Sequence, residues 1–247
     1  MTPIAEPRRI PVAIIAVALR SGWADFRALL GVSMGFAACF VFIGLGLIAG
    51  LIRAGLAPMV PPLIGGFMIF GPVTLAGFMA LQACRRRGQR ATLGIALGAM
   101  RHAGRPLWVL GAFCVFLVLI WLTDAGTLYS FMVGKSYDDW WLALPTAVGL
   151  RHFHGGAAVM GGGLAAIVYA VCVHAVPLLV RGQGTLVTAV TASVKAIGRS
   201  LLAHLAWALV LSVSVMASIY LLPALLVVLP VMAYASARLT AMVFPKP

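Results

Sequence analysis

Charged residues are scarce in this chain, which contains 5 acidic and 18 basic residues among 247. They amount to 9% of the sequence, against about 25% in soluble domains. Since 63% of the residues are apolar, the composition excludes an ordinary soluble domain and predicts that most of the chain lies in lipid. The net charge of +13 does not indicate a nucleic-acid partner, because the basic residues stand at the ends of apolar runs and not in a patch with aromatic residues.

The motifs of enzymes and of ion-coupled transporters are also missing. No acidic or basic residue lies deep within a predicted membrane span, where a charge would cost about 2.5–3.5 kcal/mol and would mark an ion pathway. The chain has no nucleophile elbow, phosphate-binding loop or paired catalytic carboxylates. Its four cysteines show no ligand spacing and do not predict a disulfide framework. We therefore predict that the protein is not an enzyme.

Long uncharged runs are present instead, and they predict six membrane-spanning helices. Residues 31–52 would form a helix about 33 Å long, which is enough to cross a hydrocarbon core of about 30 Å. Small residues four apart, Gly31 with Gly35 and Ala158 with Gly162, predict close contacts of the first and fourth spans with other helices. The six predicted spans are residues 31–52, 59–83, 106–123, 157–180, 200–221 and 223–243.

Three amphipathic segments precede pairs of spans. In the first segment, apolar residues recur every three or four positions, which predicts one apolar face of a helix. Similar patterns follow near residues 93–107 and 187–201. We predict that all three helices lie on the membrane surface with their apolar faces against the lipid. The apolar face of the first helix consists of Val12, Ile15, Leu19, Trp23, Phe26 and Leu30.

An amphipathic helix followed by two spans therefore forms a unit that occurs three times. The units, residues 10–87, 88–181 and 182–247, make up one membrane domain, residues 1–247. Because each unit contains two spans, it begins and ends on the same side of the membrane, so the repeats are parallel. The predicted fold class is an all-α polytopic membrane protein with six transmembrane helices in three parallel repeats, each preceded by an amphipathic helix on the cytoplasmic face.

The distribution of basic residues predicts the orientation. Fifteen Lys and Arg residues lie on the side of the termini and the amphipathic helices, and three lie on the other side. The positive-inside rule therefore predicts that both termini are cytoplasmic in a bacterial inner membrane. A long loop predicted at residues 124–154 would then lie in the periplasm.

Four segments carry a family pattern: residues 19–27, Gly71-Pro72, residues 176–181 and residues 229–233. Together they resemble a family of predicted prokaryotic integral membrane proteins catalogued as domain of unknown function 2189. The resemblance implies a membrane protein without an established activity, and some members are labelled as cytochrome c oxidase subunits. A catalytic haem–copper subunit needs six histidines in its membrane core, whereas this chain has 5 in all. The label therefore implies an accessory role beside a respiratory oxidase.

Three histidines form a candidate haem site. His102, His174 and His204 would lie near the cytoplasmic ends of their helices, where two of them on adjacent helices could ligate a haem. The alternative is that each is a polar interfacial residue bonded to backbone or water. The lack of a CxxCH motif or a supporting carboxylate favours this alternative.

A second candidate is a copper or zinc site on the periplasmic side, formed by His152 and His154 with Asp138 and Asp139. Two histidines separated by one residue share a direction only when the backbone is extended. The alternative is a solvated loop beside the membrane surface.

The densest positive charge in the sequence lies between the first two units. A cluster of this kind could contact an anionic lipid or an acidic partner. The alternative, which we favour, is a stop signal that fixes the topology. The cluster consists of Arg85, Arg86, Arg87 and Arg90.

We predict a non-enzymatic accessory or scaffolding protein of the inner membrane, with the lipid bilayer, anionic lipids and a membrane-protein complex as partners. No cofactor is predicted outside the haem alternative. Two other classes stay open, a haem-binding membrane protein and an uncoupled transporter or pore for a small solute. The pore would be favoured by convergence of four polar side chains on the central axis, namely Thr74, Gln82, Ser212 and Ser214.

Overall fold

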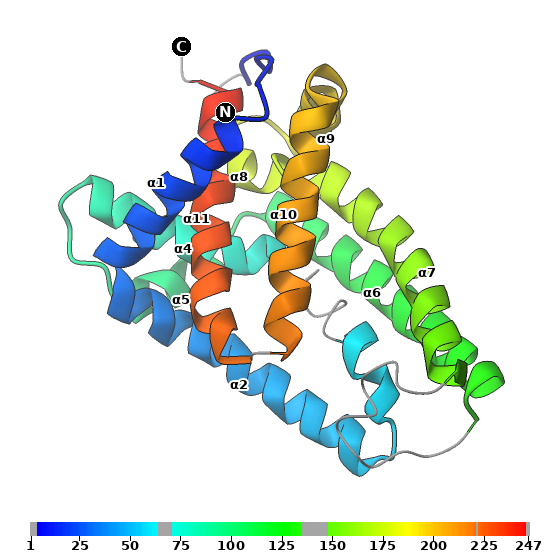
Figure 1. The fold of residues 1–247 in the computed structure, drawn as a ribbon. Coiled ribbons are helices and arrows are strands. Elements are labelled where there is room, and N and C mark those ends of the chain that lie inside the picture. The colour runs from blue at the N-terminus through cyan, green and yellow to red at the C-terminus, as the bar shows by residue number, and fades with distance from the viewer. Residues whose placement is uncertain (1–3, 64–70, 135–147, 221, 246–247) are drawn as a thin grey trace.

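The computed structural model describes residues 4–63, 71–134, 148–220 and 222–245, and every element among them is a helix. Five helical segments are long and apolar enough to cross a membrane. The predicted class of an all-α, polytopic membrane protein is therefore confirmed for this part of the chain. The elements (Figure 1) are α1 (Ile14–Ala28), α2 (Leu30–Arg53), η1 (Ala57–Met59), α4 (Gly71–Arg86), α5 (Leu93–Arg101), α6 (Arg105–Met132), α7 (Val148–Cys172), α8 (Ala175–Val180), α9 (Leu186–Arg199), α10 (Leu201–Tyr220), η3 (Leu222–Ala224) and α11 (Leu225–Val243).

The five candidate spans are α2, α6, the segment Leu150–Val180 with α7 and α8, α10, and α11. Each lies where the sequence has a long uncharged run. The predicted second span at 59–83 includes residues 64–70, which lie outside the described residues, and α4 is the described helix that follows them. A sixth span and the three repeats therefore stay predictions.

The third span is longer than predicted. α6 continues to Met132, so the prediction of a loop beginning at residue 124 was wrong. The hydroxyl groups of this polar stretch find their partners within the helix. Thr123, Thr127 and Ser130 each donate a hydrogen bond to a carbonyl oxygen one turn earlier, which satisfies their polar groups within the helix.

The fourth span is interrupted. α7 begins at Val148, earlier than the predicted start at residue 157, and ends at Cys172. Pro177 has no backbone N–H to bond the carbonyl of Val173 one turn earlier, and its ring clashes with that carbonyl. The helix therefore breaks and resumes as α8 at Ala175.

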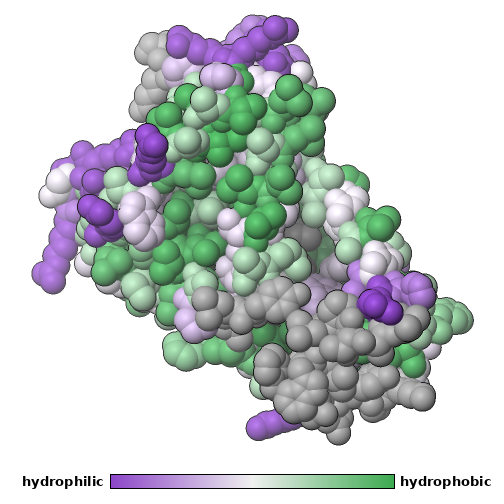
Figure 2. Space-filling view, viewed as in Figure 1, coloured by the Kyte–Doolittle hydropathy of each residue, from purple (hydrophilic) through white to green (hydrophobic). Residues whose placement is uncertain are grey.

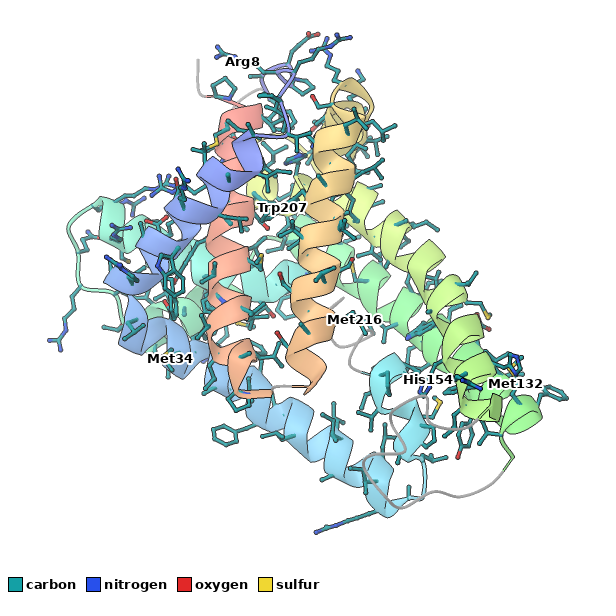
Figure 3. All side chains as sticks on the ribbon, in the orientation of Figure 1. Arg8, Met34, Met132, His154, Trp207 and Met216 are labelled. Carbon is teal, nitrogen blue, oxygen red and sulfur yellow. The ribbon has the colours of Figure 1, made fainter. Side chains whose placement is uncertain are left out.

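α11 is the central helix of the molecule. It packs against α1, α2, α4, α8 and α10 (Figure 1). Of its most apolar stretch 44% is buried, against 11% for α2. Trp207 of α10 (Figure 3) is fully buried, and it packs against Ala235 and Leu239 of α11. The helices around α11 therefore hold the buried polar groups described below.

α1 docks closely on α11 through small residues. A Cβ atom at Gly22 would lie 2.8 Å from the backbone nitrogen of Ala235 and 2.9 Å from the carbonyl oxygen of Val231. No side chain fits between backbones at these distances. The buried face of α1 consists of Ile15, Ala18, Gly22, Asp25 and Phe26.

The apolar face predicted for α1 is only partly the buried one. Ile15 and Phe26 are buried, but Val12, Trp23 and Leu30 are 49%, 45% and 49% exposed. In a membrane, large apolar side chains can face lipid while small residues face neighbouring helices. The predicted apolar face is therefore divided between α11 and the outer surface, and the position of this helix on the membrane surface stays a prediction.

The small residues predicted at close helix contacts lie on outward faces of α2 and α7. Gly31, Gly35 and Gly162 have no neighbouring atom within 4 Å of a Cβ built on them, and Ala158 is exposed. The predicted close contacts are thus wrong within this chain. A pattern of small residues indicates that helices can approach one another, but it does not say which face is used.

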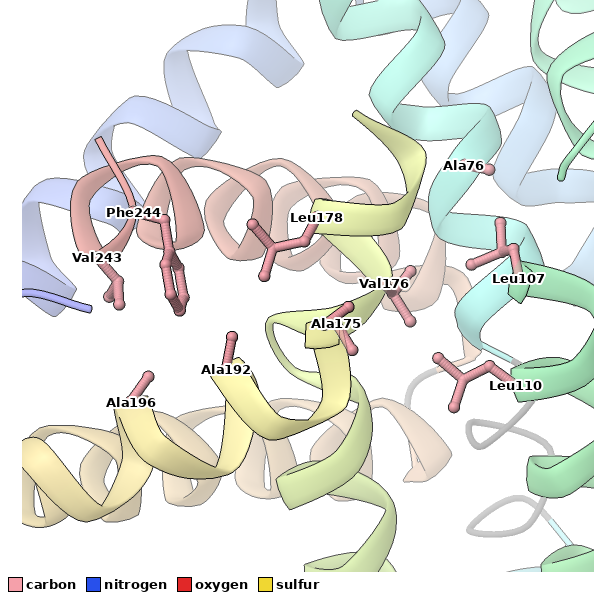
Figure 4. Close-up of a cluster of buried hydrophobic side chains, with 11 residues drawn as sticks. Ala76, Leu107, Leu110, Ala175, Val176, Leu178, Ala192, Ala196, Val243 and Phe244 are labelled. Carbon is pink, nitrogen blue, oxygen red and sulfur yellow. The ribbon is translucent and has the colours of Figure 1, made fainter. Parts of the chain in front are cut away.

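The largest buried cluster surrounds the short helix α8 (Figure 4). It joins α8 to α4, α6, α9 and the end of α11. Packing on all sides explains how six residues stay helical between two breaks, since isolated helices of this length are unstable in water. The cluster contains Ala76, Leu107, Leu110, Ala175, Val176, Leu178, Ala189, Ala192, Ala196, Val243 and Phe244.

The surface separates into apolar and hydrophilic regions. Apolar side chains cover the middle of the face shown in Figure 2, and hydrophilic ones gather at its upper end, its left end and its lower right. Phe42, Phe116 and Leu202 are 71%, 59% and 75% exposed, as expected for side chains in contact with lipid. Arg8 and Met132 mark opposite ends of the molecule (Figure 3).

Candidate functional site

The buried carboxylate of Asp25 joins α1 to α4 and α11. This residue is 0% exposed. Arg238 donates from Nε to Oδ2 over 2.8 Å and from Nη2 to Oδ1 over 2.9 Å. The amide of Gln82 donates to Oδ2 over 2.6 Å, and Arg85 donates to Oδ1. Both carboxylate oxygens are therefore held by groups from other helices.

The arginines keep Asp25 ionised despite its burial. Burial alone raises the pKa of a carboxyl group, because a low dielectric disfavours its charge. The hydrogen bond and charge of Arg238, the hydrogen bond of Gln82 and the charge of Arg85 outweigh burial and lower the pKa of Asp25 below 3.8. Asp25 is thus the negatively charged partner of Arg85 and Arg238.

Two further arginines at this site have neutral partners. Arg86 donates to Oε1 of Gln82 over 3.3 Å, and Arg181 donates to the backbone oxygen of Ala237 over 2.6 Å. Partial burial, followed by the charge of Arg238, lowers the pKa of Arg86. Burial, followed by the charge of Arg86, lowers the pKa of Arg181 to about 10. The positive charges are therefore close enough to disfavour one another.

The predicted arginine cluster is divided by the fold. All four side chains are exposed, but Arg85 and Arg86 in the last turn of α4 bind groups of this site, whereas Arg87 and Arg90 lie beyond the end of the helix. Contact of the cluster with lipid or a partner stays a prediction.

A second polar group lies at the break between α7 and α8. His174 and His204 are 0% and 1% exposed, and their Nε2 atoms are 2.8 Å apart. Nδ1 of His174 lies 2.9 Å from the hydroxyl of Thr240, and Nδ1 of His204 lies 2.9 Å from the carbonyl oxygen of Ser200. This network joins the α7–α8 break to α10 and α11.

These contacts assign the tautomers of both neutral rings. A carbonyl oxygen only accepts, so Nδ1 of His204 carries a proton and its Nε2 accepts. Nε2 of His174 therefore donates, which leaves its Nδ1 to accept from Thr240. The result is one directed chain of hydrogen bonds from Thr240 through both histidines to Ser200.

The structure brings together two of the three histidines predicted to ligate a haem. His102 lies elsewhere, exposed, with its Nδ1 2.9 Å from the carbonyl oxygen of Gly98 in its own helix. A metal ion between two imidazoles needs about 4 Å between the nitrogens, because each metal–nitrogen bond is about 2.0–2.1 Å long. The 2.8 Å between His174 and His204 is a hydrogen-bond distance. This geometry favours the structural alternative, and haem binding stays a prediction.

The predicted periplasmic metal site is described only in part. Asp138 and Asp139 lie outside the described residues. His152 is exposed, whereas Nε2 of His154 lies 3.1 Å from the carbonyl oxygen of Pro58. Both histidines belong to α7, where residues two apart face different directions. Within the described ranges, no group of three or more potential metal ligands occurs.

The four side chains that would favour a pore lie in different environments. Gln82 belongs to the buried carboxylate cluster, and Thr74 borders an apolar cavity of about 740 Å³ between α2, α4, α6 and α11. Ser212 is exposed, and the carbonyl oxygen of Ser214 accepts from the hydroxyl of Ser218. In the described part of the chain, these four side chains therefore do not line one common polar channel.

One comparison finds a family to which part of this chain is similar. Residues 59–181 match the sequence model of a family described as "Predicted integral membrane protein (DUF2189)". The resemblance to the DUF2189 family is confirmed. The matched segment contains Gly71-Pro72 and residues 176–181, two of the four segments on which the resemblance was predicted. No curated protein and no solved structure matches the chain.

Asp25 was not among the predicted site residues, although one signal could have found it. Glu6 and Asp25 are the acidic residues on the side predicted to carry fifteen Lys and Arg residues, and of these two Asp25 stands within a predicted helix. A carboxylate among so many cations favours an ion pair. Its partners could not be named from the sequence, because Arg85 and Arg238 lie 60 and 213 positions away.

Replacing His204 with leucine should lower the free energy of unfolding by about 1–3 kcal/mol, because the buried Nε2–H of His174 loses its acceptor. Denaturant unfolding in detergent, followed by circular dichroism, measures the effect. His102→Leu is the matched control and should change stability by about 0.5 kcal/mol or less, because that side chain is exposed. Equal effects of the two substitutions would contradict the assigned hydrogen-bond chain.

Proposed function

We propose that the protein is a non-enzymatic accessory or scaffolding protein of the bacterial inner membrane. Support comes from how the described core uses its polar groups. Its buried acidic and imidazole side chains are Asp25, His174 and His204, and each is bound to a side chain of another element. Groups held in this way fix helices relative to one another, which is what a scaffold requires.

The proposed topology has six spans in three parallel repeats, with both termini in the cytoplasm. Three helices at the predicted amphipathic segments, α1, α5 and α9, are each followed at once by a candidate span, α2, α6 or α10. The backbone nitrogen of Arg8 donates to the carbonyl oxygen of Val243 over 2.9 Å, so the two ends of the described chain are adjacent. Both ends on one side agree with an even number of spans. The excess of basic residues supports the cytoplasm as that side.

The partner that the family label suggests is a respiratory oxidase, beside which this chain would act as an accessory subunit. To test the proposal, the tagged chain is purified from its native membrane in mild detergent, and oxidase abundance is compared between wild-type and deletion strains. We expect a stoichiometric membrane-protein partner whose assembled level falls on deletion and recovers on complementation. Absence of a stoichiometric partner together with unchanged complexes would refute the role.

Two further measurements test the haem alternative and the orientation. A Soret band in the visible spectrum would support a haem carrier in place of a scaffold. Protease should remove a C-terminal tag in inverted vesicles and spare it in right-side-out vesicles, and the reverse pattern would contradict cytoplasmic termini.

A further inference from the structure

The arginines around Asp25 bring more positive charge than one carboxylate neutralises. Arg85 and Arg238 bind Asp25 directly. Arg86 binds Gln82, which also binds Asp25, and Arg181 binds the backbone oxygen of the residue before Arg238. Four positive charges therefore face one negative charge, which leaves a surplus of three. The surplus lies at the C-terminal ends of α4 and α8, on the helices that pack against α11.

The other acidic side chains of the described residues do not balance this surplus. Glu6 pairs with Arg199, with 3.0 Å between the nitrogen and oxygen atoms. Asp124 lies in α6, about 28 Å along the helix from Arg105 at the rise of about 1.5 Å per residue. Within the described chain, no further carboxylate is available to pair with these arginines.

Arg86 and Arg181 are the arginines placed to receive a counter-charge. In the described part of the structure each makes one hydrogen bond, and the acceptor is the neutral oxygen of Gln82 or Ala237. A guanidinium has five N–H donors in a planar fork, so both retain donors for a further ligand. A helix C-terminus attracts a cation by about 0.3–1 kcal/mol. This attraction explains one arginine at each helix end but supplies no full negative charge.

We propose that Arg86 and Arg181 together bind the phosphate of an anionic phospholipid headgroup. Arg85 and Arg238, which are bound to Asp25, lie beside this site and add positive charge to it. Guanidinium donors match phosphate oxygens in geometry and charge. α4 packs against both α5 and α8, and α5 exposes the apolar side chains Leu93, Ile95 and Leu97. Acyl chains can therefore lie on apolar surface beside the arginines, which favours a lipid over a free anion.

The test uses the purified full chain in mild detergent and follows its thermal unfolding as lipid is added. A ligand that binds the folded state raises Tm in a saturable way. We expect such a rise with phosphatidylglycerol and none with phosphatidylcholine. Inorganic phosphate serves as the free anion and should also give no rise. The assay needs no partner protein, so its result is independent of the proposed scaffolding role.

Matched double variants separate a defined site from diffuse attraction. Arg86→Gln with Arg181→Gln should weaken the apparent affinity for phosphatidylglycerol about tenfold more than Arg101→Gln with Arg105→Gln, a difference of about 1.4 kcal/mol. Arg101 and Arg105 are exposed at the junction of α5 and α6, and both double variants lose two charges. Their loss of general attraction to an anionic surface is therefore equal.

Three results would overturn the proposal. Equal weakening in both double variants would show diffuse electrostatics only, and an equal rise of Tm with inorganic phosphate would show a free-anion site. If the Arg181→Gln variant does not fold, Arg86→Gln alone is compared with Arg87→Gln, since both side chains are exposed at the end of α4. Arg86→Gln should then weaken lipid binding more than Arg87→Gln, and equal affinities would refute the site.

Discussion

Replacing Asp25 with alanine should lower the free energy of unfolding by about 3 kcal/mol, the lower end of the range for breaking a buried ion pair. The carboxylate is fully buried and holds α1 against two helices, so its loss leaves Arg238 and Arg85 without a counter-charge. The side chains of these arginines are 31% and 36% exposed, and water screens part of the effect. Denaturant unfolding in detergent measures the change.

Glu6→Ala is the matched control, because Glu6 also pairs with an arginine but its side chain is 84% exposed. An exposed pair contributes about 0–1 kcal/mol, so this variant should remain close to wild type. A loss in Asp25→Ala no larger than the loss in Glu6→Ala would contradict a structural role for the buried carboxylate.

The pH dependence of stability gives an independent signature of the same ion pair. The pKa of Asp25 in the folded chain lies below the ordinary value of 3.8, so the unfolded chain takes up the proton first as pH falls. The contribution of Asp25 is therefore complete above about pH 3.8 and is lost below it as pH falls through the lowered pKa. Asp25→Asn should remove this component, so wild type and variant should converge in stability at low pH.

Replacing Gly22 with valine should lower the free energy of unfolding by about 2–3 kcal/mol, the upper part of the range for overpacking. Its Cβ atom would meet backbone atoms of Val231 and Ala235 at 2.9 and 2.8 Å. Backbone cannot rotate away as a side chain can, so α1 must separate from α11. Thermal unfolding by circular dichroism gives the change in stability.

Gly31→Val is the control for Gly22→Val, because it also introduces valine into a helix but has no atom within 4 Å of its Cβ. It should change stability by about 0.5 kcal/mol or less. Gly22→Val and Asp25→Ala both disrupt the contact of α1 with α11, so their combined effect should be smaller than the sum. Full additivity would mean that the close approach and the ion pair act separately.

The position of most helices could be predicted from the sequence because the signals are local. An uncharged run longer than the hydrocarbon core must satisfy its backbone internally, and a helix does so within one segment. Periodic apolar residues likewise predict α1, α5 and α9 without reference to the rest of the chain. Helix ends were less predictable, as at Met132 and Cys172, because side-chain hydroxyls and proline change local bonding in ways that hydropathy does not record.

The direction in which each helix faces could not be predicted in the same way. The apolar face predicted for the first helix includes both Trp23 and Phe26, yet Trp23 is exposed and Phe26 is buried. The small residues Ala18 and Gly22 share the buried face with Phe26. In water, large apolar side chains mark the buried face of a helix. In lipid, the same side chains are equally stable on the outside, so that signal is lost.

For the candidate sites, too, the sequence indicated which residues are candidates, whereas their contacts depend on the tertiary structure. His174 and His204 were singled out together because histidines in apolar spans are few. Their contact within one hydrogen-bond chain depends on the break at Pro177, which places His174 against α10 and α11. The two histidines were therefore predictable as candidates, and their chemistry was not.

The arginine cluster between α4 and α5 was predictable as the densest charge and as a topology signal. The sequence by itself predicted the helical membrane class that the described residues show, because hydropathy and charge act residue by residue at a lipid boundary; the side on which the basic residues lie stays a prediction. Only the tertiary structure decided that Asp25 is the buried partner of Arg85 and Arg238, and that Arg86 and Arg181 are left with neutral acceptors. Pairing of charges depends on distance, and residues distant in the chain become neighbours only when α1, α4, α8 and α11 pack together.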